Sequence, residues 1–445
     1  MRGRTNISSA GGAVANGKIK EFTVANGENI KQGEFVSVKY NAQKDLIYQT
    51  AGVTNSQESK AIYVGKYGDF DIVMLVPYSG EIQMIIYKTM NLVRTVNLGR
   101  SNDSQRGEGT KYVKAYLFND KIIFIKSYND NGTTVSNMMY YNMYKLQISG
   151  ENISAVKIKS DVFKYVDASG SEQYADADTV FGGCIFEKLN DEYLVYGSGG
   201  GKSPFCLYKV VESDLEFVSF LEKQRNDLLG SVAAKQNKII VFGEGYSHVL
   251  NISEDFSSIS MGADINVELN SGYYIYVTNG LTYENNVLVF FNDGFFVHLD
   301  SENDLVIENK KLIGTTCTYG FVKNGKLYAL CIYSEKLKLI VYNFSVFLTK
   351  EHEVELFDIS KSRTSVNCMV FDEDNFKLIY GDSGNSDSSK RGFFSARGEL
   401  VGNSVTLGDE ELVYKYNGDG ESIGFSKTGG ASGQKIKVYV PIIEP

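Results

Sequence analysis

The segment YGSGGGKSP (196–204) contains a glycine run followed by Lys202 and Ser203, residue types that bind nucleotide phosphates. A phosphate-binding loop of that kind needs a glycine five positions before Gly201, where this sequence has Tyr196, and it must open a helix. The residues after it, Pro204 and FCLYKVV, continue instead as strand. We therefore predict a turn between two strands and no nucleotide cofactor.

Metal ligation has little support in the sequence. His248, His298 and His352 are far apart, and none has Cys, Asp or Glu nearby at zinc-ligand spacing. Four acidic turns offer the oxygen ligands that calcium prefers, but none has the full loop with its closing Glu: NDNG (129–132), DEDN (372–375), DSGNSD (382–387) and NGDG (417–420). Ordinary Asn/Asp turn chemistry is favoured over structural calcium, and we predict no metal site.

Hydrolysis of a polysaccharide would require two convergent carboxylates. Asp176 and Asp178 are the pair to test, because they lie in an insertion between repeats. The Gly-x-Ser-x-Gly pattern of a nucleophile elbow is absent, and three histidines leave few bases for a catalytic triad. We therefore predict no catalytic residues and no enzymatic activity.

Two aromatic segments could form a sugar-binding surface, because Tyr combines a flat apolar ring with a polar tip. They are MMYYNMYK (138–145) and SGYYIYV (271–277). The favoured interpretation of both is strand packing, with Met and Tyr on both faces.

Composition excludes several classes of protein. The net charge of −9, with no local Lys/Arg cluster, argues against nucleic-acid binding. Five widely spaced cysteines in mostly apolar strand sequence are predicted to be buried free thiols: Cys184, Cys206, Cys317, Cys331 and Cys368. The first twenty residues lack an apolar signal region, and no run of 18 apolar residues occurs. We expect synthesis in the cytoplasm without membrane insertion.

A short hairpin recurs along the chain: an apolar strand, a tight polar turn, and a β-rich strand ending in an aromatic residue. Six copies are clear and a seventh is weaker: YLFNDKIIFI (116–125), FEKLNDEYLVYG (186–197), VAAKQNKIIVFG (232–243), LTYENNVLVFF (281–291), FVKNGKLYALCIY (321–333), MVFDEDNFKLIYG (369–381) and VGKYGDFDIVMLV (64–76). Most intervals suit four-stranded propeller blades. Helical signals are almost absent, the best being LEKQRNDLLG (221–230).

The sequence therefore predicts an all-β chain with a β-propeller of about seven blades over 59–407. Expected blade bounds are 60–98, 112–159, 179–222, 229–261, 272–308, 316–359 and 365–407, with 160–178 inserted on the rim. The alternative architecture is an elongated β-sandwich array or a β-helix. Residues 1–16 are predicted to be a flexible arm.

The two ends do not repeat the blade pattern. IGFSKTGGASGQKIKVYVP (423–441) resembles a glycine-rich C-terminal element of bacteriophage virion proteins of Gram-positive hosts, and FTVANGENIKQGEFVSVKYN (22–41) resembles the first half of the same small module in head-decoration and fibre proteins. The opening MRGRTNIS is similar to the start of such proteins. Phe425 and Ser426 depart from the pattern, which has small residues there. The resemblance implies a small β-barrel-like anchoring module made of 17–58 and 408–445, with the propeller between.

The expected function is that of a non-enzymatic virion structural protein, assembled in the host cytoplasm and present in many copies. Its terminal module would bind other virion proteins of the capsid or tail, and its propeller would decorate the particle or bind a host cell-surface glycan. The alternatives are a cell-wall glycan-binding or glycan-cleaving protein and an intracellular propeller scaffold. No cofactor, nucleic acid or membrane partner is predicted.

Overall fold

A computed structural model describes the following residues: 17–24, 28–39, 45–49, 60–77, 81–88, 91–100, 113–127, 139–150, 152–174, 185–197, 204–222, 228–234, 237–243, 246–265, 277–283, 286–291, 295–300, 306–312, 316–323, 325–333, 336–343, 349–358, 364–370, 375–382, 392–401, 404–407, 412–416, 424–431 and 434–441. Every regular element within them is a β-strand, which confirms the all-β prediction. These residues contain no helix that could cross a membrane. The predicted arm, 1–16, lies outside them.

Seven antiparallel sheets follow one another along the described chain. Their strands are β5 (Lys60–Tyr67), β6 (Phe70–Val76), β7 (Glu81–Lys88) and β8 (Asn91–Arg100); β9 (Val113–Phe118), β10 (Lys121–Ser127), β11 (Met139–Ser149) and β12 (Asn152–Val162); β15 (Ile185–Lys188), β16 (Tyr193–Gly197), β17 (Phe205–Val210) and β18 (Leu215–Leu221); β19 (Leu228–Ala234), β20 (Lys238–Gly243), β21 (Tyr246–Ile252) and β22 (Ile259–Ile265); β23 (Val277–Tyr283), β24 (Asn286–Phe291), β25 (Phe295–Asp300) and β26 (Val306–Leu312); β27 (Thr316–Lys323), β28 (Lys326–Tyr333), β29 (Lys336–Asn343) and β30 (Thr349–Asp358); and β31 (Thr364–Val370), β32 (Asn375–Asp382), β33 (Gly392–Val401) and β34 (Ser404–Leu407). The four-strand segments expected from the sequence coincide with these sheets to within a few residues. Of the segment 221–230, Leu221 belongs to β18 and residues 228–230 belong to β19, while 223–227 lie outside the described residues.

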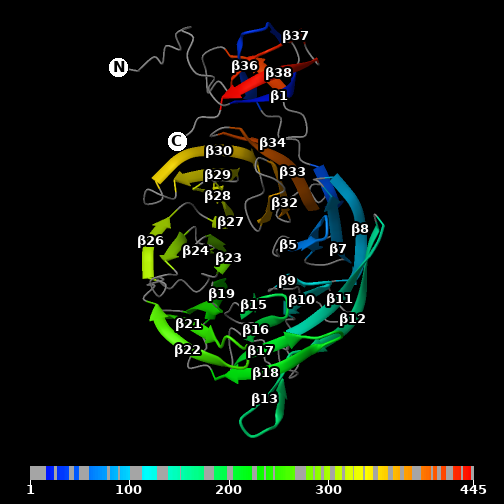
Figure 1. Cartoon of the computed structure of the whole chain (residues 1–445), viewed down its shortest axis with the longest axis vertical. Helices are drawn as coiled ribbons and strands as arrows, with labels where there is room; N and C mark the ends of the chain where they lie inside the picture. The colour runs from blue at the N-terminus through cyan, green and yellow to red at the C-terminus, as the bar shows by residue number, and fades with distance from the viewer. Residues whose placement is uncertain are drawn as a thin grey trace. The chain divides into compact units, whose positions relative to one another are not determined.

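The seven sheets are arranged in a ring, and the first strand of each lies toward the centre (Figure 1). The backbones of most successive first strands lie next to one another, and β31 of the seventh sheet contacts β5 of the first. Side-chain hydrogen bonds join β9 of the second sheet to β15 of the third. The second strands are the most apolar, and all seven residues of β6 are buried. A strand that is buried on both faces requires a neighbour on each side. Each sheet is therefore stabilised by the two that flank it.

The hydrophobic core lies between consecutive sheets. One cluster joins the first and second sheets through residues such as Ile72 and Phe124, and further clusters join the second to the third, the third to the fourth, the fourth to the fifth and the fifth to the sixth. A closing cluster contains Val73 of the first sheet and Ile379 of the seventh. The ring is thus closed by the same kind of apolar packing that builds it.

The seventh sheet also contains a strand from the N-terminal part of the chain. Strand β4 (Asp45–Gln49) pairs antiparallel with the first half of β33, where Tyr48 is opposite Phe393. The sequence-based boundary placed residues 17–58 in the terminal module, and the structure assigns β4 to the ring instead. The reason is a backbone edge: β33 extends beyond its pairing with β34 and leaves hydrogen-bonding groups that β4 satisfies.

The insertion expected at 160–178 begins later than predicted, because 160–162 continue β12, and residues 164–174 form a hairpin. Strands β13 (Lys164–Val166) and β14 (Glu172–Tyr174) pair, and the hairpin extends away from the ring (Figure 1). The Asp167 carboxylate accepts hydrogen bonds from the amide and hydroxyl groups of Ser169 and from Ser171 and Gln173, which lower its pKa to about 2. This side-chain cap fixes the turn.

Both ends of the chain fold into one separate unit. By compactness the chain divides into a terminal unit, 1–43 with 396–445, and a ring unit, 44–395. The division falls within β33 and places β34 of the seventh sheet on the terminal side, whereas the sequence-based boundary was 407/408. In the terminal unit β1 (Gly17–Val24), β35 (Leu412–Lys415), β3 (Phe35–Lys39), β36 (Gly424–Ser426) and β38 (Lys435–Pro441) pair in that order, and β38 pairs back with β1. Strands β2 (Asn29–Ile30) and β37 (Gly430–Ala431) pair alongside. Their apolar core includes Phe22, Val36 and Val438.

Gly424 of the terminal unit allows a close approach of two strands. A Cβ atom at this position would lie 2.0 Å from the backbone oxygen of Tyr439 in β38, and backbone cannot rotate away as a side chain can. We expect Gly424→Ala to lower the free energy of unfolding by about 1–3 kcal/mol, as overpacking does elsewhere. Hydrogen exchange of β36 and β38 would measure the loss locally. The exposed substitution Ala431→Ser in the same unit is the control, and equal protection in both variants would contradict the prediction.

Candidate functional site

A pocket of about 500 Å³ opens where the first three sheets meet. Its apolar wall comes from Val64 of β5 and Leu117 of β9, and Tyr67 adds an aromatic side chain. The other lining residues are Gly65, Lys66, Asn119, Asp120, Lys188 and Asp191. Gly65 is required here because its φ is +141° and a Cβ atom would lie 3.3 Å from the Leu117 Cβ. Three separate hairpins therefore contribute to one concave surface.

Most of the pocket's charged groups are held by internal contacts. The Lys188 ammonium donates to the Leu117 carbonyl oxygen and lies 2.6 Å from Asp191 Oδ1. Asn119, with a left-handed φ of 51°, donates from Nδ2 to the Asp191 carbonyl oxygen at 3.3 Å. Burial opposes ionisation of Asp120, but the ammonium groups of Lys121 and Lys145 outweigh it and lower its pKa. The pocket wall therefore holds positive and negative side chains in fixed positions.

Lys66 differs from these groups because it is exposed and no ion pair of its ammonium occurs within the part of the chain that the structure describes. Its positive charge acts on Asp71, a buried carboxylate that accepts a hydrogen bond from the Tyr63 hydroxyl at 2.9 Å. Burial raises the pKa of Asp71 more than Tyr63 and Lys66 lower it. Lys66 is therefore the pocket's available cation.

A buried carboxylate next to the pocket holds three first strands together. Glu187 of β15 is 5% exposed, and its Oε1 lies 2.5 Å from Lys114 Nζ of β9. It also accepts hydrogen bonds from Tyr116 of β9 at 3.1 Å and from Ser231 of β19 at 2.7 Å. Burial and the nearby Glu187 raise the pKa of Tyr116 well above its usual value, so its hydroxyl remains a donor. All four groups are paired, which makes this cluster a structural link between sheets.

The turn between β17 and β18 crosses to the second sheet through a second charged cluster. Asp214 accepts a hydrogen bond from the buried Tyr141 hydroxyl and pairs with Lys159 at 2.7 Å. Glu212 pairs with Lys145 and, at 3.4 Å, with Lys121. The Lys145 hydrogen bond lowers the pKa of Glu212. These contacts, made by Asp214 and Glu212, join the third sheet to the second at two positions.

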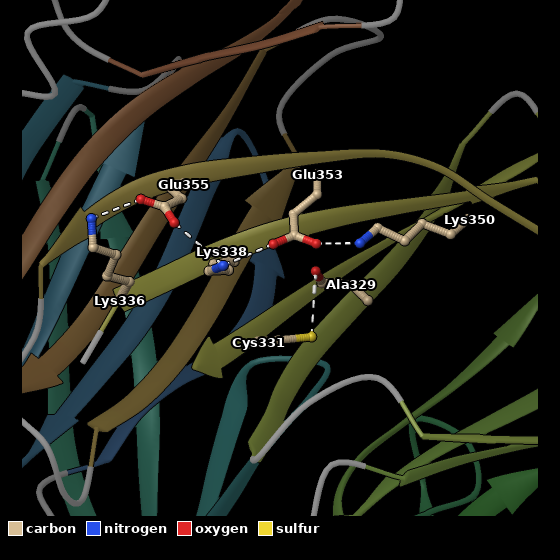
Figure 2. Close-up of polar contacts among 7 residues, drawn as sticks. All are labelled: Ala329, Cys331, Lys336, Lys338, Lys350, Glu353 and Glu355. Atoms are coloured by element: carbon tan, nitrogen blue, oxygen red, sulfur yellow. Dashed lines mark hydrogen bonds and ion pairs between the residues drawn. The ribbon is translucent and has the colours of Figure 1, made fainter. Parts of the chain in front are cut away.

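Ion pairs also cover the outer strands of the sixth sheet, as Figure 2 shows. Lys336 pairs with Glu355 at 2.7 Å, and Lys338 pairs with Glu353 at 2.8 Å and with Glu355 at 3.3 Å. Lys350 also contacts Glu353. Exposed pairs of this kind contribute little each, so this ladder is interpreted as a solvated surface.

The candidates taken from the sequence are mostly separated by the fold. His248 of β21 lies 2.6 Å from Asp264, while His298 and His352 belong to β25 and β30 of other sheets. The glycine run of 198–203 lies outside the described residues, but β16 and β17 flank it, and the predicted strand after Pro204 is confirmed. Asp176 and Asp178 lie outside the described residues, as do most residues of the four acidic turns.

The packing interpretation of 138–145 is confirmed where the structure describes it. Tyr141, Met143 and Tyr144 of β11 are buried, whereas Tyr140 is 37% exposed. Most of 271–277 lies outside the described residues. Cys206 and Cys331 are buried free thiols, as predicted. The described residues contain no group of three or more metal-ligating side chains.

Sequence reasoning missed both the pocket and the Glu187 cluster. The available signal was the hairpin itself, because FEKLNDEYLVYG places charged Glu187 within a buried apolar strand. A buried carboxylate in such a strand requires partners. Those partners come from β9 and β19, which no local pattern relates to β15.

Comparisons with known proteins give no family. No family model and no curated protein matches the chain. Among solved structures, Saccharomyces cerevisiae Sqt1 is 10% identical, covering 87% of this chain and 100% of that one with a TM-score of 0.47. A protein from Lactobacillus plantarum is 9% identical over 76% of this chain and 96% of its own, with a TM-score of 0.46. A functionally unknown protein from Desulfotomaculum acetoxidans is 11% identical, covering 74% of this chain and 96% of its own, with a TM-score of 0.41.

Removing the Glu187 carboxylate should weaken the ring. Glu187→Ala leaves Lys114, Tyr116 and Ser231 without their shared acceptor. We expect a loss of about 2 kcal/mol in the free energy of unfolding, below the roughly 3–5 kcal/mol of fully buried pairs because Lys114 stays partly solvated. Chemical denaturation would measure it. The exposed Glu192→Ala is the matched control, and equal losses in the two variants would contradict the prediction.

Asp71 should make stability depend on pH. A carboxyl whose pKa is higher in the folded protein binds its proton more tightly there, so stability is lost as pH rises from the unfolded value through the folded one. Asp71→Asn keeps an oxygen acceptor for Tyr63 and removes this loss. We expect the variant to gain stability relative to the parent at pH 7 but not at pH 3.

Thermal unfolding of both proteins across that pH range would measure the difference. Asp69→Asn, which removes an exposed carboxylate from the preceding turn, controls for the change in net charge. A gain for Asp71→Asn that is constant with pH would show that burial of the charge is not its cause.

Proposed function

We propose that this chain is a non-enzymatic structural protein of a bacteriophage particle. The terminal unit attaches to other virion proteins, and the ring unit is displayed. The observation that carries this proposal is the pairing of the two segments that resemble phage virion modules. Residues 22–41 supply β2, β3 and part of β1, residues 423–441 supply β36, β37 and β38, and these strands pair with each other. Segments nearly 400 residues apart thus form one module.

The ring unit is best interpreted as a seven-bladed β-propeller. Four-stranded antiparallel sheets, first strands that contact one another around the centre and cores between neighbouring sheets all support this interpretation. Because the chain enters and leaves the ring near one sheet, through β4 and β33, it can be inserted into a module without disturbing its own closure.

Display in many copies suits a protein whose individual contacts are weak. Repeated on a particle, modest binding by each ring adds to strong attachment without a single tight site. The displayed ring would decorate the capsid or tail, or contact the host cell surface.

The experiment is to purify particles from cultures that produce this chain and to locate it with an antibody against the ring unit. We expect the chain to co-sediment with intact particles in a density gradient and to label at regular positions by electron microscopy. Recovery only in the particle-free fractions would contradict the proposal.

A second candidate function is binding of cell-wall glycan, and the pocket favours it. Tyr67 beside Lys66 and Asn119 gives an aromatic side chain with nearby polar groups, as saccharide sites have. Retention on purified cell-wall polysaccharide without particle association would support this candidate over the first.

A further inference from the structure

Four apolar side chains form a continuous row on the outside of the terminal unit. Ile19 of β1 is opposite Tyr439 of β38, Tyr439 is opposite Phe425 of β36, and Phe425 is opposite Phe35 of β3. Ile19 is 60% exposed and Phe35 is 48% exposed, and the two central rings contact each other at 5.2 Å. We call these four residues the apolar row.

The row is not a by-product of core packing. Alternation along each strand directs its neighbours to the other face, where Val36, Ile436 and Val438 are fully buried. Outward positions of a two-faced sheet are normally polar. Four adjacent exceptions indicate a surface that is covered by something else.

Lysines border the apolar row. The Lys427 ammonium lies 4.8 Å from the Phe425 ring centre and 5.2 Å from that of Tyr439. Lys435 and Lys437 are exposed on the same side of β38 as Tyr439. None of these three forms an ion pair with a carboxylate of the described chain; Glu21 is opposite Lys437 but does not pair with it.

Other lysines of the molecule do have acidic partners. Lysines of the ring unit such as Lys114, Lys159 and Lys338 have carboxylates within 3 Å, and in the terminal unit itself Lys415 pairs with Glu34 at 2.6 Å. An ammonium group near an apolar surface gains most from a carboxylate that arrives with the partner and is desolvated with it. The border therefore selects for acidic chemistry.

We propose that the apolar row is the docking surface of the terminal unit, and that its occupant is a separate protein with an apolar groove bordered by Asp and Glu. The proposal rests on the proposed function in one respect, because it identifies the surface by which the terminal unit attaches. Aromatic side chains inserted into a groove would supply the affinity, and the lysines would set orientation and association rate.

A second copy of this chain is the competing occupant. Row-to-row contact would bring lysines of both copies together, which is unfavourable. Residues 44–395 contain 34 Lys/Arg against 44 Asp/Glu, so the ring unit is acidic, while the terminal unit contains 11 against 10. Opposite charges would therefore permit a contact between the row and another copy's ring unit. The experiment must therefore distinguish the two occupants.

The test uses the full chain and synthetic peptides in which Phe and Leu alternate with Asp and Glu, with Lys-containing versions as controls. We expect the acidic peptides to bind, more weakly at high salt, and the Lys versions not to bind. The double variant Ile19→Thr with Phe35→Thr should bind about tenfold less. Leu92→Thr with Tyr333→Thr, which removes residues 53% and 48% exposed on the ring unit, is the matched control.

Fluorescence anisotropy would measure binding, thermal unfolding would confirm that each variant is folded, and sedimentation velocity would measure self-association. Failure of the acidic peptides to bind, or equal binding by the double variant, would overturn the proposal. Concentration-dependent dimers that the double variant abolishes would show a second copy as occupant and also overturn it. Because no particle is used, these results are independent of whether the chain co-sediments with one.

Discussion

In each sheet the second strand is buried on both faces, and the rest of this molecule depends on that constraint. A four-stranded sheet whose second strand is buried throughout, as β6 is, cannot be stable with one face in water. Each sheet must be flanked on both sides, and a row of sheets satisfies that condition for all its members only if it closes. The cluster that joins Val73 to Ile379 provides this closure in apolar contacts, and β4 on β33 provides it in backbone hydrogen bonds.

Closure also explains why the two ends of the chain can share a unit. A closed ring brings its first and last sheets together, so the segments before β4 and after β34 begin close to one another. The terminal unit uses this proximity: β1 pairs with β38 over seven consecutive residue pairs.

The charged side chains of the described residues fall into two groups, those that pair within the chain and those that do not. Among the described residues of the ring unit, charged side chains pair within the chain either as links between sheets, as Glu187 and Asp214 do, or as a solvated ladder on the sixth sheet. Such groups are satisfied and specify geometry. Lys66 in the pocket and Lys427 beside Phe425 and Tyr439 have no carboxylate partner among the described residues, and the two proposed binding surfaces include them.

The sequence by itself determined the strands, because alternation, turn residues and the repeated hairpin are local properties that short-range physics enforces. It placed the seven four-strand segments within a few residues. It could not assign β4, since a strand with an unpaired edge takes whichever partner the closed ring presents. Nor could it find the pocket, the partners of Glu187 or the apolar row. These features join residues from three or four strands that are distant in sequence, and only the register between strands brings them together.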